Sequence, residues 1–216
     1  MKRMPTLTTE VETLLSNYPD LASLGAEVTR ACDLLLNCFR GGNKVLACGN
    51  GGSAADCEHL VGELMKGYLS TRPLPESARP ALLASAPDDG AYLADHLQGA
   101  LPAISLVSQV GLITAVANDM GPDLIFAQQV LGFGRPGDVL IAISTSGNSR
   151  NVVLAARVAR ARGLSTLAFT GRSGGALRAA SDVALCVPHD RTAVIQERHL
   201  ALYHTLCAVV EREIFG

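Results

Sequence analysis

Five short runs of apolar residues constrain the fold of this chain more strongly than any other feature. Each run carries charge, if any, only at its beginning, and stretches with helical spacing lie between the runs. Strands that are apolar throughout are buried on both faces, as in a parallel sheet covered by helices. We therefore predict a doubly wound α/β fold with about five parallel strands. The predicted strands are residues 44–50, 103–108, 137–144, 165–171 and 182–188.

Apolar residues at helical spacing fill most of the chain between these strands. Residues 8–40 predict two helices that break near Tyr18 and Pro19, because proline interrupts the pattern. The other predicted helices are residues 53–68, 111–119, 124–131, 148–163 and, at the end of the chain, 192–214. We interpret residues 1–216 as a single domain that begins with a helical segment at 1–42.

The segment 69–102 departs from this alternation. It contains five prolines and the sequence "APDDGAY", which is too rich in turn residues for regular structure throughout. Long loops in compact domains are often functional. We interpret the segment as an excursion or a lid, and a solvated loop is the alternative.

Composition argues against several classes of protein. Hydrophobic residues make up 48% of the chain, so a full core is expected, and the formal charge of −2 argues against binding nucleic acid through bulk positive charge. No apolar run approaches the ~18 residues of a membrane helix or resembles a signal peptide. The six cysteines form no CxxC motif, which favours buried thiols in a reducing compartment. We expect a cytoplasmic protein without nucleic-acid or membrane partners.

A loop rich in hydroxyl groups, "STSGNS", follows the third predicted strand and precedes a helix. The first amides of a helix lack intrahelical partners and carry partial positive charge, so they attract anions. Hydroxyl groups add donors, and Gly147 allows close approach of the backbone. A helix cap is the alternative, but one cap needs only Asn148 or Ser149. We predict a phosphate site, with hydroxyl donors from Ser144, Thr145, Ser146 and Ser149.

A second loop, "GNGGS" at residues 49–53, occupies the equivalent place after the first strand. It does not match GxGxxG, and no acidic residue follows the next strand to hold a ribose, which disfavours a dinucleotide site. Two donor loops at neighbouring strand ends favour a phosphorylated sugar.

Two predicted helices carry polar side chains suited to proton transfer. His59 and Glu63 are four residues apart, so they share one helix face, and we expect them near the phosphate site. His204 lies in the apolar stretch "LALYHTLC" of the last helix, which also carries Gln196. A surface pair at 59 and 63 and a structural core histidine at 204 are the alternatives. His199 is expected to be exposed.

The chain resembles the sugar isomerase (SIS) family and, within it, the phosphoheptose isomerases. The resemblance covers roughly residues 10 to 215 apart from the excursion, and it implies a flavodoxin-like fold and a cytoplasmic homotetramer with active sites at subunit interfaces. The matching motifs are "CGNGGSAADCEHLVGEL", "AVANDMGPD", "GRPGDVLIAISTSGNSRNV", "LAFTGRSGG" and "VIQERHLALYH".

The resemblance also implies a reaction and its residues. The reaction is the isomerisation of sedoheptulose 7-phosphate to glycero-manno-heptose 7-phosphate through an enediol(ate), the first step of nucleotide-activated heptose biosynthesis for lipopolysaccharide. Glu63 and His204 would transfer the protons, and one zinc ion per site would be held by His59, Glu63, Gln196 and His204. The residues implied to contact substrate are Asn50, Gly51, Gly52, Ser53, Asn118, Asp119, Ser144, Thr145, Ser146, Ser149 and Gln196.

The spacing of Gln196 and His204 restricts this ligand set. Eight residues correspond to about 12 Å of rise on a regular helix, and the two side chains diverge by about 80°. One straight helix therefore cannot present both to one ion through ~2 Å bonds. Either Gln196 precedes the regular helix, or the two residues come from different subunits, which is our hypothesis.

Some features keep other functions open. Gly67 and Val194 stand where the family carries arginine, although Lys66 and Arg191 lie nearby. One alternative is a non-catalytic SIS partner of the replication initiator, which the presence of both Glu63 and His204 disfavours. Another is an isomerase for a pentose or hexulose phosphate.

Overall fold

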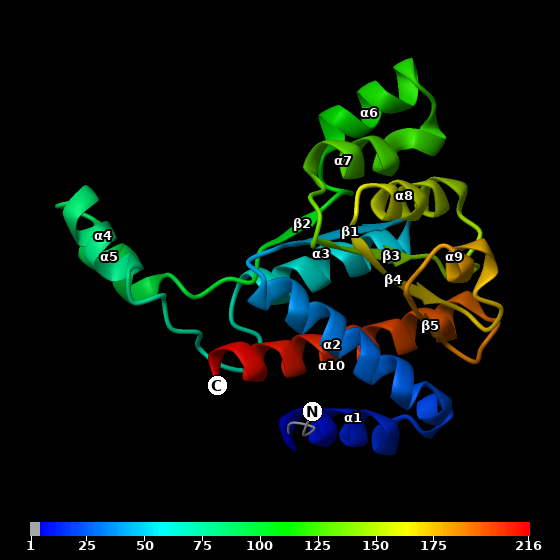
Figure 1. The fold of residues 1–216 in the computed structure, drawn as a ribbon, viewed down its shortest axis with the longest axis horizontal. Coiled ribbons are helices and arrows are strands. Elements are labelled where there is room, and N and C mark those ends of the chain that lie inside the picture. The colour runs from blue at the N-terminus through cyan, green and yellow to red at the C-terminus, as the bar shows by residue number, and fades with distance from the viewer. Residues whose placement is uncertain (1–4) are drawn as a thin grey trace.

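The computed structural model describes residues 5–216, with a five-stranded parallel sheet at its centre (Figure 1). The strand order β2-β1-β3-β4-β5 is the doubly wound order of flavodoxin-like folds, so the predicted fold class is confirmed. All five predicted strands exist, each shorter than its predicted range. They are β1 (Val45–Gly49), β2 (Ala103–Ser105), β3 (Val139–Ile143), β4 (Ser165–Thr170) and β5 (Val183–Cys186).

Side chains of the central strands alternate between two hydrophobic layers. Val45 and Ala47 of β1 pack into one layer, and Leu46 and Cys48 pack into the other. Every residue of β1 and β3 is buried, which explains why these runs are apolar throughout. The sheet therefore needs helices on both of its faces.

One face of the sheet is covered by three helices, with a fourth outside them. The outer helix α1 packs against α2 and α10 (Figure 1). The break predicted near Tyr18 and Pro19 is present as the 3-10 helix η1. The elements on this face are α1 (Pro5–Asn17), η1 (Pro19–Leu24), α2 (Gly25–Arg40), α3 (Gly52–Met65) and α10 (Thr192–Phe215).

The opposite face is covered mainly by α7 and α8, which pack against each other, and α6 lies beyond α7 (Figure 1). The 3-10 helix η2 contacts the first turn of α8, where Arg150 forms an ion pair with Asp123 at 2.8 Å. The elements here are α6 (Val110–Asp119), η2 (Pro122–Leu124), α7 (Ile125–Phe133), α8 (Arg150–Ala161) and α9 (Gly175–Ala179).

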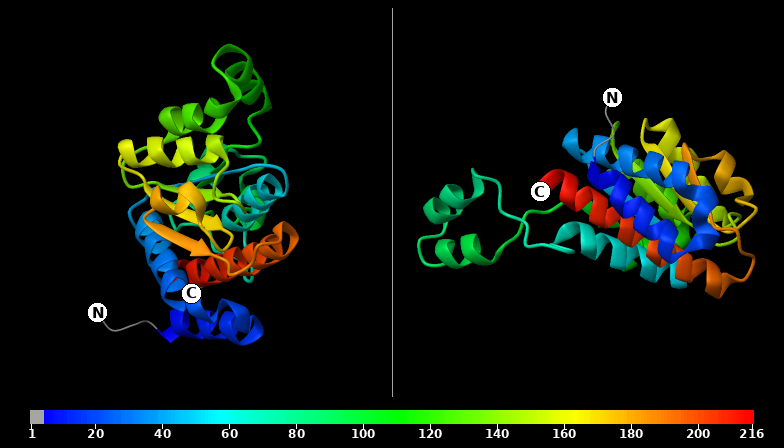
Figure 2. Two further views of the ribbon diagram at one scale, coloured as in Figure 1. Left: turned by 90° about the vertical axis from the view of Figure 1, so that its right-hand side faces the viewer. Right: turned by 90° about the horizontal axis from the view of Figure 1, so that it is seen from below.

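The proline-rich excursion contains two short helices that the sequence analysis did not predict. Helices α4 (Ala78–Ser85) and α5 (Gly90–His96) form a hairpin that stands apart from the sheet and its covering helices (Figure 2). The two helices pack on each other, and no residue of α4 is buried. The hairpin projects outward on the side of the protein where α10 ends, so it is not a lid over the carboxyl ends of the strands in its own chain (Figures 1 and 2).

A buried ion pair anchors the base of the excursion. The Arg72 guanidinium donates to a Glu211 carboxylate oxygen at 2.7 Å and to the backbone carbonyls of Glu63 and Leu64 at the end of α3. Both charged side chains are about 1% exposed. The Glu211 carboxylate also accepts three backbone N–H groups, from Tyr68, Leu69 and Ser70. The excursion is therefore fixed to α3 and α10 at once.

Two further expectations concern single residue types. All six cysteines are free thiols, and the expected burial is confirmed for five of them, whereas Cys186 is half-buried. The expectation for His199 is wrong: this residue is fully buried, and its Nε2–H donates to the Thr170 carbonyl at 3.2 Å. Burial lowers the pKa of His199 to about 4, so the imidazole is neutral at physiological pH. Within residues 5–216, no helix is both long and apolar enough to span a membrane.

Candidate active site

The two donor loops meet at the carboxyl edge of the sheet. Strands β1 and β3 are neighbours, with Gly49 opposite Ile143, so the loops that follow them leave the sheet side by side. The side-chain amides of Asn50 and Asn151 exchange two hydrogen bonds of 2.9 Å. The strand order reverses between β1 and β3, and ligands of doubly wound folds bind at this switch point. The loop after β1 is thus joined to the first turn of α8, directly after the second loop, where a ligand is expected.

Three serine hydroxyls gather in the loop after β3. Ser144 Oγ lies 3.0 Å from Ser149 Oγ and 3.5 Å from Ser146 Oγ. Ser149 stands at the N-cap position of α8, but its side chain makes no capping hydrogen bond to the helix. The hydroxyl faces Ser144 instead, so the helix-cap alternative is not the arrangement observed. Hydroxyl donors and the positive end of α8 converge as an anion site requires.

Gly147 has a structural role that the sequence analysis did not anticipate. Its φ of 67° is left-handed, and a Cβ there would collide with the backbone of Gly174 in the loop after β4. Helix α9, which follows that loop, supports the serine cluster: Leu177 N–H donates to the Gly147 carbonyl at 2.9 Å, and Ala176 N–H donates to Asn148 Oδ1 at 3.0 Å. A glycine is therefore required here by a backbone crossing.

A second polar cluster lies between α3 and α10, which run side by side in the same direction (Figure 1). At the start of α3, Gly52 packs against the side-chain amide of Gln196, which would have to move to make room for a Cβ. Two turns further, His59 Nε2 lies 3.5 Å from His204 Nε2 and 3.3 Å from Glu63 Oε1. His59, Glu63 and His204 of one chain are therefore neighbours, and Gln196 lies apart from them.

Charge and burial tune this second cluster. Burial is the larger cause that lowers the pKa of His204, and the neighbouring His59 lowers it further. Glu63 raises the pKa of His204 and partly offsets these two effects. Lys66 Nζ donates to Glu63 Oε2 at 2.8 Å, so the Glu63 carboxylate faces a cation on one side and an imidazole on the other. A neutral imidazole beside a carboxylate can exchange protons with a ligand between them.

The same atoms fit part of a zinc site. Ligand atoms ~2.0–2.1 Å from a tetrahedral zinc ion are about 3.3 Å apart. The pairs His59–Glu63 and His59–His204 are at 3.3 and 3.5 Å, which matches this edge length. The described residues nevertheless contain no group of three or more histidine, cysteine or acidic side chains closed around one point. The donor types and pairwise spacings fit zinc, and the complete ligand set is not assembled within one chain.

Comparison with known proteins decides the family. Models of the SIS domain match residues 10–97 and 103–210. A phosphoheptose isomerase of Akkermansia muciniphila is 39% identical over 203 residues, which cover 94% of each chain, and one of Shewanella sp. (strain W3-18-1) is 39% identical over 207 residues. The chain belongs to the phosphoheptose isomerase family of SIS domain proteins.

Solved structures agree with this assignment. A phosphoheptose isomerase of Neisseria gonorrhoeae is 36% identical, with a TM-score of 0.73 and coverage of 93% of this chain and 94% of that one. One of Francisella tularensis is 30% identical, with a TM-score of 0.75 and coverage of 98% and 100%. The Vibrio vulnificus NanR protein, complexed with ManNAc-6P, shares only 15% identity at a TM-score of 0.56 and supports the fold alone.

In this SIS domain, the serine cluster of Ser144, Ser146 and Ser149 lies apart from the second polar cluster. The second polar cluster consists of His59, Glu63 and His204. Helix α3 starts at the donor loops and runs back along the sheet, and Leu101, just before β2, donates its N–H to the Leu64 carbonyl. The 11 residue-to-residue steps from Gly52 to Glu63 correspond to about 16 Å of rise. Glu63 therefore lies well along α3 from the donor loops of its own chain, and the place of His59 and Glu63 near a phosphate site stays a prediction.

Asn118 and Asp119 are predicted substrate contacts that lie on α6 and not in the donor loops of this SIS domain. They end α6, are exposed apart from a 2.7 Å hydrogen bond between their side chains, and α6 packs against α7 and η2. In residues 5–216, neither side chain hydrogen-bonds to the two donor loops. Their implied role stays a prediction.

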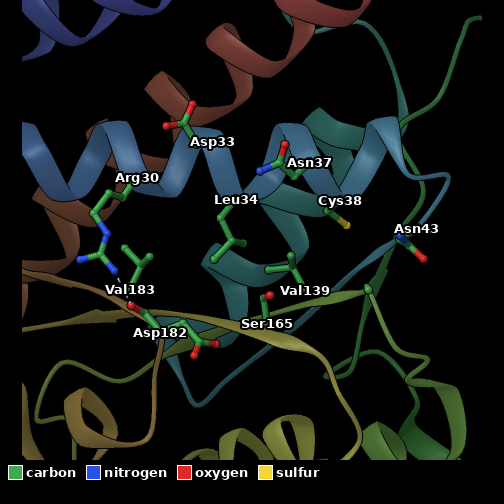
Figure 3. Close-up of a pocket in the computed structure, with 11 residues that line it drawn as sticks. Arg30, Asp33, Leu34, Asn37, Cys38, Asn43, Val139, Ser165, Asp182 and Val183 are labelled. Atoms are coloured by element: carbon green, nitrogen blue, oxygen red, sulfur yellow. Dashed lines mark hydrogen bonds between the residues drawn. The ribbon is translucent and has the colours of Figure 1, made fainter. Parts of the chain in front are cut away.

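This SIS domain also contains a large cavity away from the donor loops and the second polar cluster. A cavity of about 500 Å³ opens between α2 and the amino ends of β3, β4 and β5 (Figure 3). Its lining includes Arg30, whose guanidinium donates to the Asp182 carbonyl at 2.9 Å. This edge of the sheet is opposite to the switch point, where ligands of such folds bind. We therefore assign the candidate site to the donor loops and to the α3–α10 cluster.

Several residues near the second cluster were not singled out by sequence reasoning. Tyr203 is fully buried, and its hydroxyl lies 2.9 Å from His59 Nδ1. Asp56 lies one turn before His59 in α3, with Oδ2 buried and unpartnered among the described residues. The spacing of 56 and 59 on one helix is the only sequence signal for this group, since Tyr203 is distant in the chain.

Proposed function

We propose that this chain interconverts sedoheptulose 7-phosphate and glycero-manno-heptose 7-phosphate, the first step of nucleotide-activated heptose biosynthesis. The family supplies the reaction class, an aldose–ketose isomerisation. The observation that carries the substrate class is the cluster of Ser144, Ser146 and Ser149 hydroxyls at the uncapped start of α8. A phosphate monoester needs several donors around its oxygens, and this cluster offers them without a fixed charge.

The donor loops bind and orient the substrate in this proposal. Ser144, Thr145, Ser146 and Ser149 hold the phosphate, and the loop from Asn50 to Ser53 holds the sugar chain. The paired amides of Asn50 and Asn151 keep the two loops at a fixed separation. Fixed donors lower the barrier because little reorganisation is needed when charge develops on the substrate.

Glu63 and His204 move the protons. The isomerisation shifts a proton between C1 and C2 through an enediol(ate), which needs a base for the carbon-bound proton and an acid–base group for the oxygens. The Glu63 carboxylate is the base and the His204 imidazole serves the oxygens. The lowered pKa of His204 keeps the imidazole neutral at physiological pH, so it can both accept and donate.

We also propose one zinc ion per site, bound through His59, Glu63, Gln196 and His204. When bound, zinc would stabilise negative charge on the enediolate oxygens. Gln196 lies inside the continuous helix α10, so the alternative that it precedes the regular helix is wrong. One chain cannot present both Gln196 and His204 to one ion. The proposal therefore takes Gln196 from a different subunit.

A homotetramer with shared active sites follows from the same geometry. Gln196 packs on Gly52 beside the donor loops, whereas His59, Glu63 and His204 lie further along α3 and α10. The separation of about 16 Å along α3 exceeds the roughly 10 Å that eight bonds of ~1.5 Å span between a heptose C1 and its phosphorus. Loops and Gln196 of one subunit would thus face Glu63 and His204 of another. Free, mostly buried thiols favour a cytoplasmic location.

The direct test is turnover of sedoheptulose 7-phosphate by the purified protein, with and without a chelator, beside a panel of pentose and hexulose phosphates. Glu63→Gln and His204→Ala should reduce turnover by at least ~10³-fold without unfolding the chain. Glu76→Gln and His96→Ala, exposed residues of the excursion, are the matched controls. No turnover after zinc is restored would refute the enzyme and favour the non-catalytic partner, and a preference for a shorter sugar would refute the substrate.

A further inference from the structure

Within residues 5–216, the α4–α5 hairpin packs on little besides itself. Its two helices have eight and seven residues, and helices shorter than about 12–15 residues are marginal in water unless other surfaces pack against them. The helices pack on each other, no residue of α4 is buried, and the hairpin projects away from the sheet (Figure 2). The hairpin therefore needs a further surface from outside its own subunit.

The tip of the hairpin, residues 83–92, combines acidic and apolar side chains and carries no lysine or arginine. Asp88 and Asp89 lie in the turn between the helices, and both are exposed and unpaired in the described part of the chain. Leu83 and Tyr92, in the adjoining turns of α4 and α5, are 45% and 64% exposed. The tip therefore suits a basic surface with an apolar floor.

A groove of the opposite character lies beside the donor loop after β3. It has a volume of about 380 Å³ and is lined by Asn148, Arg150, Val153, Leu154, Arg157 and Ala176. Helix α8, which forms most of the groove, carries three arginines and no acidic residue. Arg157 is exposed and has no hydrogen-bond or ion-pair partner among the described residues. The two guanidinium groups and the aliphatic floor of this groove complement the tip.

The groove within reach of the tip is that of another subunit. In its own chain, the hairpin and the first turn of α8 lie at opposite ends of the protein (Figure 1). The foot of the hairpin lies beside the proposed base, because Arg72 donates to the Glu63 carbonyl at 2.8 Å. The shared active site brings another subunit's Ser149 within the roughly 10 Å of a heptose from Glu63, and Arg157 follows Ser149 by about 12 Å along α8. Residues 73–75 and the eight residues of α4 together span about 22 Å, which covers this distance.

We propose that the hairpin is an arm whose tip docks into the groove between Arg150 and Arg157 of a second copy of this chain, beside the donor loops that complete the shared active site. The inference rests on that proposed shared site. The two aspartates of the tip face the two arginines, and its two apolar side chains cover the aliphatic floor of the groove. The excursion thereby covers the active site of another subunit, although it is not a lid over its own strands.

Zero-length crosslinking tests the contact directly, because the chain has only three lysines, at positions 2, 44 and 66. Arg157→Lys keeps the charge and places an amine in the groove, so a carbodiimide should join it to Asp88 or Asp89. We expect a product of twice the chain mass on a denaturing gel, with linked peptides that contain residue 157 and the tip. Arg30→Lys, at an exposed arginine on the opposite edge of the sheet, is the matched control and should give no link to the tip. Absence of the link between residue 157 and the tip, or a link within one chain, would overturn the inference.

Charge reversal gives a second measurement that needs no crosslink. Asp88→Arg/Asp89→Arg in the tip and Arg157→Glu in the groove should each weaken self-association of the full-length protein at least ~10-fold in sedimentation equilibrium, because like charges then face each other. The three substitutions combined should recover most of that loss. Glu76→Arg, at the base of the hairpin, is the control and should associate as the wild type does. Unchanged association in the reversed variants, or losses that simply add in the combination, would overturn the docking.

Neither measurement requires turnover, so the two proposals can fail separately. A link between tip and groove in a protein that turns over no sugar phosphate supports the arm and refutes only the proposed reaction. Turnover of sedoheptulose 7-phosphate without that link refutes the arm and leaves the reaction in place.

Discussion

The Arg72–Glu211 ion pair gives the sharpest test of how the excursion is held. Removing one partner of a buried ion pair leaves the other charge buried without its partner, which lowers the free energy of unfolding by about 3–5 kcal/mol. The two partners are not equivalent here. In Arg72→Met, the Glu211 carboxylate keeps the backbone N–H groups of Tyr68, Leu69 and Ser70, so we expect the low end, about 3 kcal/mol.

Glu211→Leu should be worse than Arg72→Met. It leaves the buried guanidinium with only the Glu63 and Leu64 carbonyls, and it removes the acceptor of three backbone N–H groups. We expect about 5 kcal/mol. The double variant Arg72→Met/Glu211→Leu removes both charges together, so its cost should fall below the sum of the single costs by about 2–3 kcal/mol.

The assay is denaturant unfolding of the full chain at one protein concentration, since association would shift the midpoint. A proteolysis time course localises the effect, because loss of the pair should expose the excursion before the sheet. Single variants within about 1 kcal/mol of the wild type, or additive costs in the double variant, would show that the pair does not hold the excursion.

Three further predictions concern other residues. Ser144→Ala, which removes the hydroxyl shared by the serine cluster, should raise the KM for the sugar phosphate about tenfold with little change in the unfolding temperature; an unchanged KM would remove Ser144 from the phosphate site. The pKa of His199 is lowered to about 4, so the unfolded chain binds its proton first as the pH falls, and stability should drop by about 1.4 kcal/mol per pH unit between roughly 6.5 and 4. His199→Gln should flatten that part of a plot of unfolding free energy against pH, and an unaltered slope would assign the acid sensitivity elsewhere. Gly147→Ala should lower the free energy of unfolding more than Gly42→Ala does, because both glycines have a left-handed φ but only Gly147 meets the Gly174 backbone. The control Gly42→Ala should lose about 1–2 kcal/mol. Equal losses for the two variants in thermal unfolding would contradict the backbone crossing.

The sheet could be predicted because its signal is local. Each strand is a continuous apolar run, and Val139–Ile143 is buried at every position. The apolar sequence of a strand therefore predicts its burial on both faces. The donor loops could be predicted for the same reason, since parallel strands bring their following loops to one edge. What the sequence did not reveal was the support behind the loops, because the crossing at Gly147 joins segments separated along the chain.

The errors have a common physical cause, which is that a short segment does not show what covers it. His199 lies on a helix whose polar residues suggest exposure, yet the Thr170 carbonyl and the neighbouring strand enclose it. Arg72 and Glu211 are charged residues 139 positions apart, and no feature of the sequence around either residue predicts that they are buried together.

The two ends of the excursion touch each other. Gly99 N–H donates to the Arg72 carbonyl at 3.1 Å, and a Cβ on Gly99 would lie 2.6 Å from the Pro73 carbonyl oxygen. The chain therefore leaves the rest of the protein after Arg72 and returns at Gly99, next to Gln98, whose Oε1 accepts the Gly67 N–H at 2.7 Å. We therefore expect a change of length between Pro73 and Gln98 to leave the strands in place, which makes this junction a suitable point for grafting a foreign sequence.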